Sequence, residues 1–523
     1  MSTDYAAEKT QTNLKKRVSR FREGAFVDGA KLAAPFDDEV DFVVVGSGAA
    51  GAVAAYRLAT HGWKVAMIEE GPWYDTEDFV PRVGPSFTNL LRDQGLQVAE
   101  GRSFIPLIQG RAVGGSTVVN SAIVWRLPED VIDDWSARFG LAPVVGNHAL
   151  DPHYEALERE LSVTPTEREI EGTINTLFHE AAHALGIATR PMDRYTKGCQ
   201  GSANCMQGCP HGAKQGMQRS YVPWTLEAGG RLIASVGVDR VEIRGGRAVA
   251  IHGTSASGAP VTVRARRGVL LAASTIQSPA ILRRSGLRNV HLGKHFQAHP
   301  GHGVAGNFDR PIGMNNAATQ GAESIHFRKT HRFKLETLSM PPELVSARVP
   351  GVGAALGGRL AAVGNLAVWV VQVRTHAEGE VGTTLFGRER TTFTPTQKDM
   401  ETTRFATATI AKMLFEAGAK EVWPGVHGVP SVLTSPDQVK LLEEGPTDPR
   451  SYGFILSHLF GAARMAADAR AGVVDLNFQV HGVDGLHVVD SSVFPTNLGV
   501  NPQHGIMALS RLAADRITGL HRH

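Results

Sequence analysis

The chain contains few cysteines and no excess of charge of one sign. Only three of its 523 residues are Cys, and a chain of this length can bury a core large enough to fold without disulfides. Lys and Arg number 54 against 51 Asp and Glu, a formal net charge of +3. The broad basic surface that nucleic acid binding requires is therefore not expected. With 42% hydrophobic and 20% charged residues, the composition is that of an ordinary globular protein.

Long uninterrupted apolar segments are also missing. Residues 1–36 form a polar N-terminal extension without the apolar stretch of a secretory signal, which predicts a cytoplasmic protein. Arg359 and Asn365 interrupt the longest weakly polar run, 351–373, whereas a spanning helix needs about 20 mainly apolar residues without an unpaired charge. We expect no transmembrane segment. We interpret 351–373 as a buried loop or helix ahead of a strand at 366–373, with a membrane-facing hydrophobic entrance as the alternative.

Glycine, in contrast, is abundant at 57 residues and forms a nucleotide-binding pattern near the N-terminus. A strand-like run at 41–46 leads into Gly46-x-Gly48-x-x-Gly51, an Ala-rich helix pattern and a second strand that ends at Glu69. Such glycines permit a tight turn, close approach to a pyrophosphate and close helix–strand packing, and the helix N-terminus attracts the phosphates. An acidic residue about 20 positions further on can accept from ribose hydroxyls. This arrangement predicts a bound dinucleotide, either NAD or FAD.

A second glycine cluster lies at 110–120. Gly114 and Gly115 are followed by Ser116, and Asn120 ends the segment. Adjacent glycines and small polar residues form a concavity of backbone N–H groups that suits a phosphate or a flavin edge, although a simple turn is the alternative. Two such segments suggest a long dinucleotide held along its length.

Four segments in this order resemble the glucose–methanol–choline (GMC) family of FAD-dependent oxidoreductases. Residues 41–71 are similar to its FAD motif, 110–120 to its first signature, 274–286 to its second signature, and 457–515 to its C-terminal catalytic segment. Within the family the chain most resembles long-chain alcohol oxidases and dehydrogenases that carry an iron–sulfur cluster. The resemblance implies an α/β fold: a Rossmann-type FAD-binding domain and a discontinuous substrate domain built on an antiparallel sheet.

The resemblance also implies a division of the chain into domains. We expect an N-terminal extension, an FAD-binding domain in three parts, a substrate or cap segment with the Cys-rich loop, and a substrate-binding domain. Their ranges are 1–36 for the extension, 37–135, 225–305 and 451–523 for the FAD-binding parts, 136–224 for the cap segment and 306–450 for the substrate-binding domain. A hairpin is predicted at 236–251, and its Val238 is expected beside the FAD.

Two residues bear on how FAD is held. Some family members bond FAD covalently through a His just before the Asn of the first signature, but Val119 stands there in this chain. We therefore predict non-covalent FAD. Asp490 follows a predicted strand and is expected to face the ribityl chain or the pyrophosphate.

The C-terminal segment supplies the predicted catalytic residues. Alcohol oxidation needs an acceptor for the hydroxyl proton, and a neutral imidazole is suited to this role. By resemblance that acceptor is His458, although Ala462 and Ala463 replace the family's usual Thr-Cys. Asn501 is expected to hold the developing alkoxide, and the backbone at Asn501 and Pro502 to face the flavin N1–O2 edge.

Three further histidines lie in the C-terminal segment. His504 lies close enough to Pro502 in sequence to be an alternative pocket residue. We interpret His481 and His487 as structural or exposed.

The three cysteines lie together as Cys199, Cys205 and Cys209, with the spacing C-x5-C-x3-C. Three thiolates can hold a [3Fe–4S] cluster, and the spacing resembles that of family members that bear a cluster and pass electrons to a cytochrome partner. Zinc bound with His211 is one alternative. A metal-free loop is another, because residues 212–215 resemble the long-chain alcohol oxidases.

These observations predict an FAD-dependent alcohol dehydrogenase that passes electrons to a non-nicotinamide acceptor, such as a cytochrome. The alternatives are an O₂-using oxidase of the same fold, an FAD-containing lyase, and an electron-transfer subunit without its own substrate. The His458 and Asn501 pair argues against the last of these. For the substrate, a hydrophobic or cyclic alcohol is favoured over a sugar.

Overall fold

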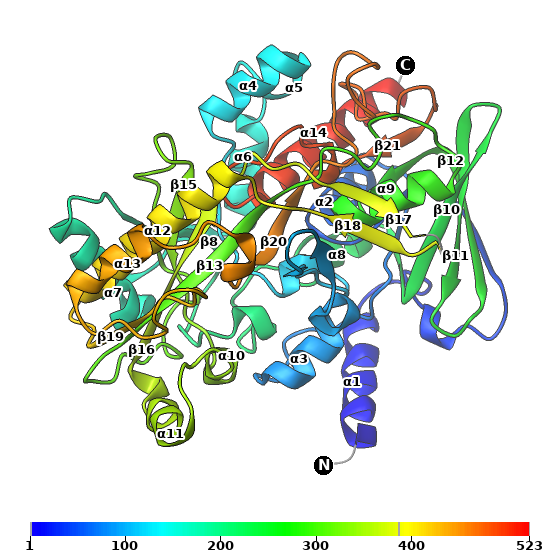
Figure 1. Cartoon of the computed structure of the whole chain (residues 1–523). Coiled ribbons are helices and arrows are strands. Elements are labelled where there is room, and N and C mark those ends of the chain that lie inside the picture. Colours follow the sequence, from blue (N-terminus) through cyan, green and yellow to red (C-terminus); the bar gives the residue numbers. More distant parts are fainter. Residues whose placement is uncertain (1–2, 385–386, 522–523) are drawn as a thin grey trace.

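The computed structural model describes residues 3–384 and 387–521. The predicted segments 1–36, 306–450 and 451–523 each include one of the pairs 1–2, 385–386 and 522–523, which lie outside the described residues. The described chain is organised by two large sheets, which lie on opposite sides of the molecule (Figure 1).

The first sheet has a parallel centre built from apolar strands. At the centre β2 (Phe36–Val45) pairs with β3 (Val65–Ile68) and with β12 (Pro260–Leu271), all parallel. Side chains such as Val44, Val45 and Leu270 are buried there. Continuous apolar strands are typical of parallel sheets covered on both faces. The strand order is β1 (Phe26–Asp28), β9 (Arg231–Ala234), β3 (Val65–Ile68), β2 (Phe36–Val45), β12 (Pro260–Leu271), β11 (Arg247–Ser255) and β10 (Val236–Arg244), with β21 (Leu486–Val488) also paired to β12.

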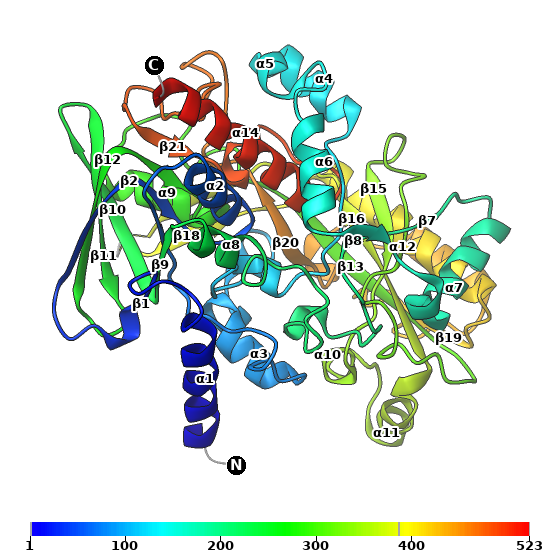
Figure 2. The same cartoon turned by 180° about the vertical axis from the view of Figure 1, so that it is seen from behind.

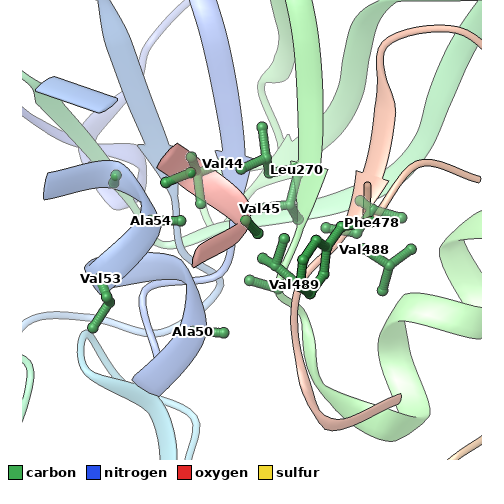
Figure 3. Packing of buried hydrophobic residues seen from close by; sticks show 14 of the residues in the cluster. Val44, Val45, Ala50, Val53, Ala54, Leu270, Phe478, Val488 and Val489 are labelled. Carbon is green, nitrogen blue, oxygen red and sulfur yellow. The ribbon is translucent and has the colours of Figure 1, made fainter. Parts of the chain in front are cut away.

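Helices pack on this sheet and complete its core. Figure 3 shows Val53 and Ala54 of one helix near Val44, with Val488 and Phe478 on the other side of Leu270. The helix with Val53 and Ala54 is α2 (Ala49–Thr60), which lies beside α14 (Gln503–His521) (Figure 2). The packed helices are α2 (Ala49–Thr60), α8 (Tyr221–Glu227), α9 (Ser274–Arg284) and α14 (Gln503–His521). The predicted strand–glycine loop–helix–strand unit and the hairpin at 236–251 are confirmed.

The second sheet is antiparallel and forms the other half of the molecule. Its order is β19 (Glu421–Trp423), β13 (Gln297–Asn307), β16 (Leu366–Val373), β15 (Phe333–Thr337), β14 (Ala322–Ser324) and β7 (Arg190–Pro191), with β20 (Ile455–Phe460) also paired to β13. Helices α12 (Gln397–Glu416) and α7 (Arg168–Ala184) pack against it. A capping box between Thr396 and Asp399 begins α12. The predicted fold class, a Rossmann-type sheet joined to an antiparallel substrate-domain sheet, is confirmed.

Smaller elements surround the two sheets. A four-stranded sheet consists of β17 (Glu380–Thr383), β18 (Glu389–Thr392), β4 (Val98–Glu100) and β5 (Ile105–Pro106), and a two-stranded one of β6 (Val163–Pro165) and β8 (Asp193–Tyr195). The remaining α-helices are α1 (Thr3–Val18), α3 (Val83–Leu90), α4 (Glu129–Phe139), α5 (Ala142–Val145), α6 (Asp151–Glu160), α10 (Pro342–Ser346), α11 (Gly353–Ala361) and α13 (Lys440–Glu443).

Strand β20 joins the two halves. It pairs with β13 of the antiparallel sheet, yet it belongs to the C-terminal segment 451–523 that also supplies β21 and α14 to the first half. In Figure 1 it runs between the two sheets. A residue on β20 is therefore held where the two halves meet, and the domain division stays a prediction.

The run 351–373 is only partly as expected. Strand β16 is buried, as predicted. Helix α11 has no buried residue, Val352 just before it is 84% exposed, and the helix protrudes from the body (Figure 1). The prediction of a buried segment is wrong for 353–361, because the apolar side chains there have no neighbouring element to cover them.

The N-terminal extension is anchored to the body. The Arg17 side chain donates to the backbone oxygen of Trp73 at 3.1 Å and to Asp78 at 2.8 Å, and Leu14 is buried. Within the described ranges, no helix combines the length and the apolar composition needed to cross a membrane.

Candidate active site

A cavity of about 1320 Å³ lies between the two sheets. Its walls include the carboxyl ends of β2, β3 and β12 on one side and residues of β13, β16 and β20 on the other. The predicted site residues that line it are Gly46, Gly48, Glu69, Gly115, Ser116, Asn120, Val238, His458, Asp490, Asn501 and Pro502. Residues remote in sequence thus meet at one cavity, as expected at the carboxyl ends of a parallel sheet. Their individual roles stay predictions.

Gly51 and Gly114 do not line the cavity; each supports one of its glycine loops. A Cβ atom on Gly51 would overlap the carbonyl oxygen of Gly46, so only glycine lets α2 pack this closely. The two glycine loops also touch, since a Cβ on Gly115 would lie 3.0 Å from the Cα of Gly48. The loops therefore form one continuous wall of exposed backbone.

Ser47 connects this wall to Glu69, a contact that the sequence analysis missed. The Ser47 hydroxyl accepts from the Gly114 backbone N–H at 2.9 Å and donates to Glu69 at 2.7 Å. Glu69 also accepts from the backbone N–H groups of Ser47 and Gly71, each at 2.9 Å. Burial raises the pKa of the Glu69 carboxyl, and these hydrogen bonds oppose the rise. A carboxylate has about four acceptor positions, so one is left for a ligand hydroxyl.

These residues fit a dinucleotide such as FAD. Helix α2 begins after Gly48, which provides no side-chain cap. Its first backbone N–H groups are thus available to an anion at the positive end of the helix dipole. The second glycine loop lies against the first, and Glu69 stands at the end of β3. Together they offer hydrogen-bond donors for phosphates and a hydrogen-bond acceptor for a ribose hydroxyl along one wall.

Asp490 holds two chain segments at the same cavity. It accepts from the Ser274 backbone N–H at 3.0 Å, the Ser278 hydroxyl at 2.5 Å and the Ser492 backbone N–H at 2.9 Å. Burial raises the pKa of its carboxyl, and the serine hydrogen bonds oppose the rise. The carboxylate therefore joins the start of α9 to the loop after β21.

The predicted catalytic pair lies where the two halves meet, with His458 from β20 and Asn501 from the loop before α14. His458 comes from β20, and its Nε2 lies 3.5 Å from Nδ2 of Asn501. Its Nδ1 lies 3.3 Å from Nδ1 of His299, a β13 residue that the sequence analysis missed. Burial, and after it the charge of Lys334, lower the pKa of His458 to about 3. The imidazole is therefore neutral near pH 7, the form that can accept a proton.

Asn501 is held from behind by a buried cation that the sequence analysis also missed. Its Oδ1 accepts from Nζ of Lys334 at 2.6 Å. Lys334 is fully buried and forms ion pairs with Glu323 and Glu336. Lys334 and Glu336 are two residues apart on β15, and this spacing is the sequence signal that places them on a common face.

The other histidines considered lie outside the cavity lining. His504 is buried between the Tyr195 hydroxyl, 2.6 Å from its Nδ1, and Glu158, 3.1 Å from its Nε2. His487 is buried on β21, and burial lowers its pKa to about 4. His481 is half-buried. The structure thus gives no support to His504 as a pocket residue.

The cysteine loop does not fit a metal site. Cys205 and Cys209 are buried, Cys199 is half-buried and accepts from the Arg194 guanidinium at 3.0 Å, and all three thiols are free. In the part of the chain that the structure describes, no three His, Cys, Asp or Glu side chains are grouped to hold a metal ion. The predicted [3Fe–4S] cluster at Cys199, Cys205 and Cys209 finds no support, and neither does zinc with His211.

The same loop has instead a structural attachment. The Lys214 ammonium is buried and donates to the backbone oxygens of Val118 and Asn120, each at 2.7 Å, and of Cys205 at 2.8 Å. Burial lowers the pKa of Lys214 to about 8. One side chain thereby ties the cysteine loop to the second glycine segment.

Known proteins are similar to this chain in sequence. An uncharacterized GMC-type oxidoreductase of Mycobacterium tuberculosis (strain ATCC 25618 / H37Rv) is 34% identical over 484 residues, which cover 92% of this chain and 76% of that protein. Long-chain-alcohol oxidase FAO1 of Arabidopsis thaliana is 25% identical over 550 residues, 98% of this chain and 71% of that protein.

Solved structures agree in fold at lower sequence identity. Pyridoxine 4-oxidase from Mesorbium loti superposes with a TM-score of 0.71 at 18% identity, covering 92% of this chain and 99% of that one. An Aspergillus oryzae RIB40 formate oxidase, studied for its FAD modification, gives 0.70 at 17%, covering 94% and 100%. Residues 40–301 and 388–510 match the two parts of GMC oxidoreductases. The chain belongs to the GMC oxidoreductase family of FAD-dependent enzymes.

Proposed function

We propose that this enzyme oxidises an alcohol CH–OH group to a carbonyl, with His458 and Asn501 at the substrate oxygen. The supporting observation is the 3.5 Å approach of His458 Nε2 and Asn501 Nδ2 in the cavity that the glycine loops also line. Bound FAD would supply the two-electron acceptor for the hydride that leaves the carbinol carbon. His458 accepts the hydroxyl proton, and Asn501 donates to the oxygen as negative charge develops there.

His299 bears on which His458 nitrogen carries the proton. The Gly499 backbone N–H donates to Nε2 of His299 at 2.9 Å, which leaves the proton of a neutral His299 on Nδ1, facing His458 Nδ1. In that state His458 carries its own proton on Nε2 and donates to the substrate oxygen. A bound hydroxyl that donates to Nε2 requires the other tautomer. Hydrogen-bond donation by His458 is therefore the second candidate role, and the variants below separate the two.

The low pKa of His458 predicts a flat pH profile on the acid side. Only neutral His458 accepts a proton, and burial together with the Lys334 charge lowers its pKa to about 3. We expect kcat/KM for flavin reduction to stay level from about pH 8 to about pH 5, with FAD content checked at each pH. A free imidazole has a pKa of about 6.5 and would lose roughly tenfold in its neutral form by about pH 5.5. A fall of that size would contradict the assignment.

The cavity wall beyond the catalytic pair supports a hydrophobic alcohol as substrate. Its lining there is mostly apolar: Met340, Leu344, Val345, Val368, Val370 and Ile455. An aliphatic or cyclic alcohol needs few polar partners, whereas a sugar must have each of its hydroxyls hydrogen-bonded when it is buried. We propose the hydrophobic class over sugars.

The electron acceptor is proposed to be a non-nicotinamide compound or protein. The cysteine loop is not proposed as an electron path, because its thiols are not grouped for a cluster in the described structure. The similarity to a long-chain-alcohol oxidase and to an oxygen-dependent choline dehydrogenase favours O₂ as the second candidate. Stoichiometric hydrogen peroxide during aerobic turnover would select O₂.

FAD binding is proposed to be non-covalent. Val119 lines the cavity in the first signature segment, and its side chain has no atom that can attack the flavin ring. The neighbouring Asn120 donates to Gln503 and accepts from the Ala122 backbone N–H at 3.1 Å.

Anaerobic reduction tests the proposed function directly. The FAD-loaded enzyme is mixed without oxygen with 1-dodecanol, cyclohexanol or glucose, and the flavin absorbance is followed. We expect bleaching by one of the two apolar alcohols, with release of the matching aldehyde or ketone, and slower bleaching by glucose. An enzyme that converts an alcohol while its flavin stays oxidised would be a lyase. If none of the three alcohols reduces the flavin, the proposal is overturned.

A further inference from the structure

A buried ion cluster stands directly behind the proposed catalytic pair. The side chains of Lys334, Glu323 and Glu336 are all fully buried. The Lys334 ammonium lies 2.5 Å from Glu323 and 2.6 Å from Glu336. Buried ions are costly unless they are paired and hydrogen-bonded, so the partners of each ion matter for the stability of the cluster.

The sheet register assembles the cluster. Lys334 and Glu336 are two residues apart on β15 and point to the same face. Glu323 on β14 is the direct partner of Glu336 across the antiparallel pair. The three charges therefore occupy adjacent positions on one face of the second sheet.

Each carboxylate has partners besides Lys334. Glu323 accepts from the Trp125 indole N–H at 2.9 Å and from the Arg190 guanidinium at 2.8 Å. Glu336 accepts from the side-chain amides of Gln320 at 2.6 Å and Gln372 at 3.0 Å, and both glutamines line the cavity. The two carboxylates are thus held in place independently of Asn501.

The third partner of the ammonium determines the direction of the Asn501 amide. An ammonium group has three donors and no acceptor, and the partners of Lys334 are Glu323, Glu336 and Oδ1 of Asn501. Because Oδ1 must face a group that only donates, Nδ2 is the end of the amide that faces His458 at 3.5 Å. Turned the other way, the amide would present an acceptor to the substrate oxygen and repel developing negative charge.

We infer that Lys334 is a positioning residue: the ammonium, clamped by Glu323 and Glu336, holds the Asn501 amide with its N–H groups toward the substrate oxygen. The inference rests on the proposed alcohol oxidation. Lys334 itself does not line the cavity and is not a catalytic residue. A merely structural ion cluster would stabilise the pairing of β14 and β15 without acting through Asn501.

A double-mutant cycle with Asn501 separates these two roles. Lys334→Met is combined with Glu336→Gln, so that one positive and one negative charge are removed together. This pair of substitutions is introduced into the parental enzyme and into the Asn501→Ala variant, which gives four proteins to compare. With Asn501 present, we expect flavin reduction to slow by roughly tenfold or more, because a fixed donor to a developing oxyanion is worth about a hundredfold or more. In the Asn501→Ala background the same pair should change the rate by less than about twofold. Equal slowing in both backgrounds would overturn the inference.

The same four proteins give a readout that needs no substrate. If Lys334 holds Asn501, the loss of Tm caused by Asn501→Ala should be smaller once Lys334 and Glu336 are replaced. If the Tm changes of Asn501→Ala and of the Lys334 and Glu336 pair are additive, Lys334 does not hold Asn501. If no alcohol reduces the flavin of the enzyme, the proposed function is rejected. The stability cycle would still decide whether Lys334 holds Asn501.

A variant that leaves the ion cluster intact covers the case in which the charge-matched pair does not fold. Asn501→Asp keeps an oxygen toward Lys334 but removes both N–H donors. We expect the alcohol to reduce the flavin of this variant as slowly as it reduces the flavin of Asn501→Ala. A parental rate in Asn501→Asp would show that no donor from this position is needed, and the inference would fall.

Discussion

Replacing His458 with Ala is expected to leave the enzyme yellow and to slow its reduction by alcohol at least ~100-fold. The imidazole lies on β20, beside the antiparallel sheet, whereas the glycine loops that fit FAD lie on the other wall. The variant therefore loses the proton acceptor and keeps its cofactor. The measurement is anaerobic stopped-flow reduction, with the flavin content of each preparation determined from its absorbance.

His458→Gln distinguishes the two roles that the site allows. Glutamine keeps a donor near the substrate oxygen but cannot take up a proton. Slowing equal to that of His458→Ala identifies a base, while a rate within about tenfold of the parental one identifies a donor that stabilises the oxyanion. His331→Ala is the matched control, because His331 is exposed and its loss should not change the rate. A parental rate in both His458 variants would remove this residue from the mechanism.

The nucleotide half of the molecule is predictable because its signals are local. The glycine loop, the helix that follows it and the strand that ends at Glu69 are consecutive in sequence. Backbone conformation and close packing restrict the loop positions to glycine, so the glycines in the sequence indicate the geometry of the loop. Glu69 was found in the same way, but Ser47 was not, since a serine between two glycines has no distinctive spacing.

The opposite wall is predictable only in part. His458 and Asn501 were located by family resemblance, and the structure brings them together. His299 and Lys334 come from separate strands of the antiparallel sheet, and no spacing relates them to the catalytic segment. A Lys and a Glu alternating along a strand normally indicate a solvated face, whereas β15 is entirely buried. Only pairing across the sheet shows that these charges satisfy one another.

The cysteine loop shows where spacing misleads. Three cysteines within eleven residues are compatible with a cluster, but spacing does not specify where the thiols point. The buried Lys214 directs the loop backbone toward the second glycine segment, through carbonyl contacts that carry no sequence signature.

Replacing Gly51 with Ala is expected to deplete the purified enzyme of FAD. The new Cβ would overlap the carbonyl oxygen of Gly46, so α2 must move away from the first glycine loop. Overpacking of this kind costs about 1–3 kcal/mol of stability. It also displaces the helix N-terminus that we expect to bind the FAD phosphates. We expect FAD affinity to fall by at least about tenfold, which corresponds to about 1.4 kcal/mol, as measured by titrating the apoprotein with FAD.

Gly357→Ala is the matched control for this loss, because it adds the same methyl group to another helix. Gly357 lies in the exposed helix α11, where a Cβ would meet no atom of a neighbouring segment within 4 Å. Alanine there should raise stability slightly, by about 0.4–1 kcal/mol, because it restricts the unfolded chain, and FAD binding should not change. If Gly51→Ala binds FAD as tightly as the parent does, close packing of α2 on its loop is not what forms the phosphate site. If both variants lose FAD equally, the loss reflects general instability and not the geometry at Gly51.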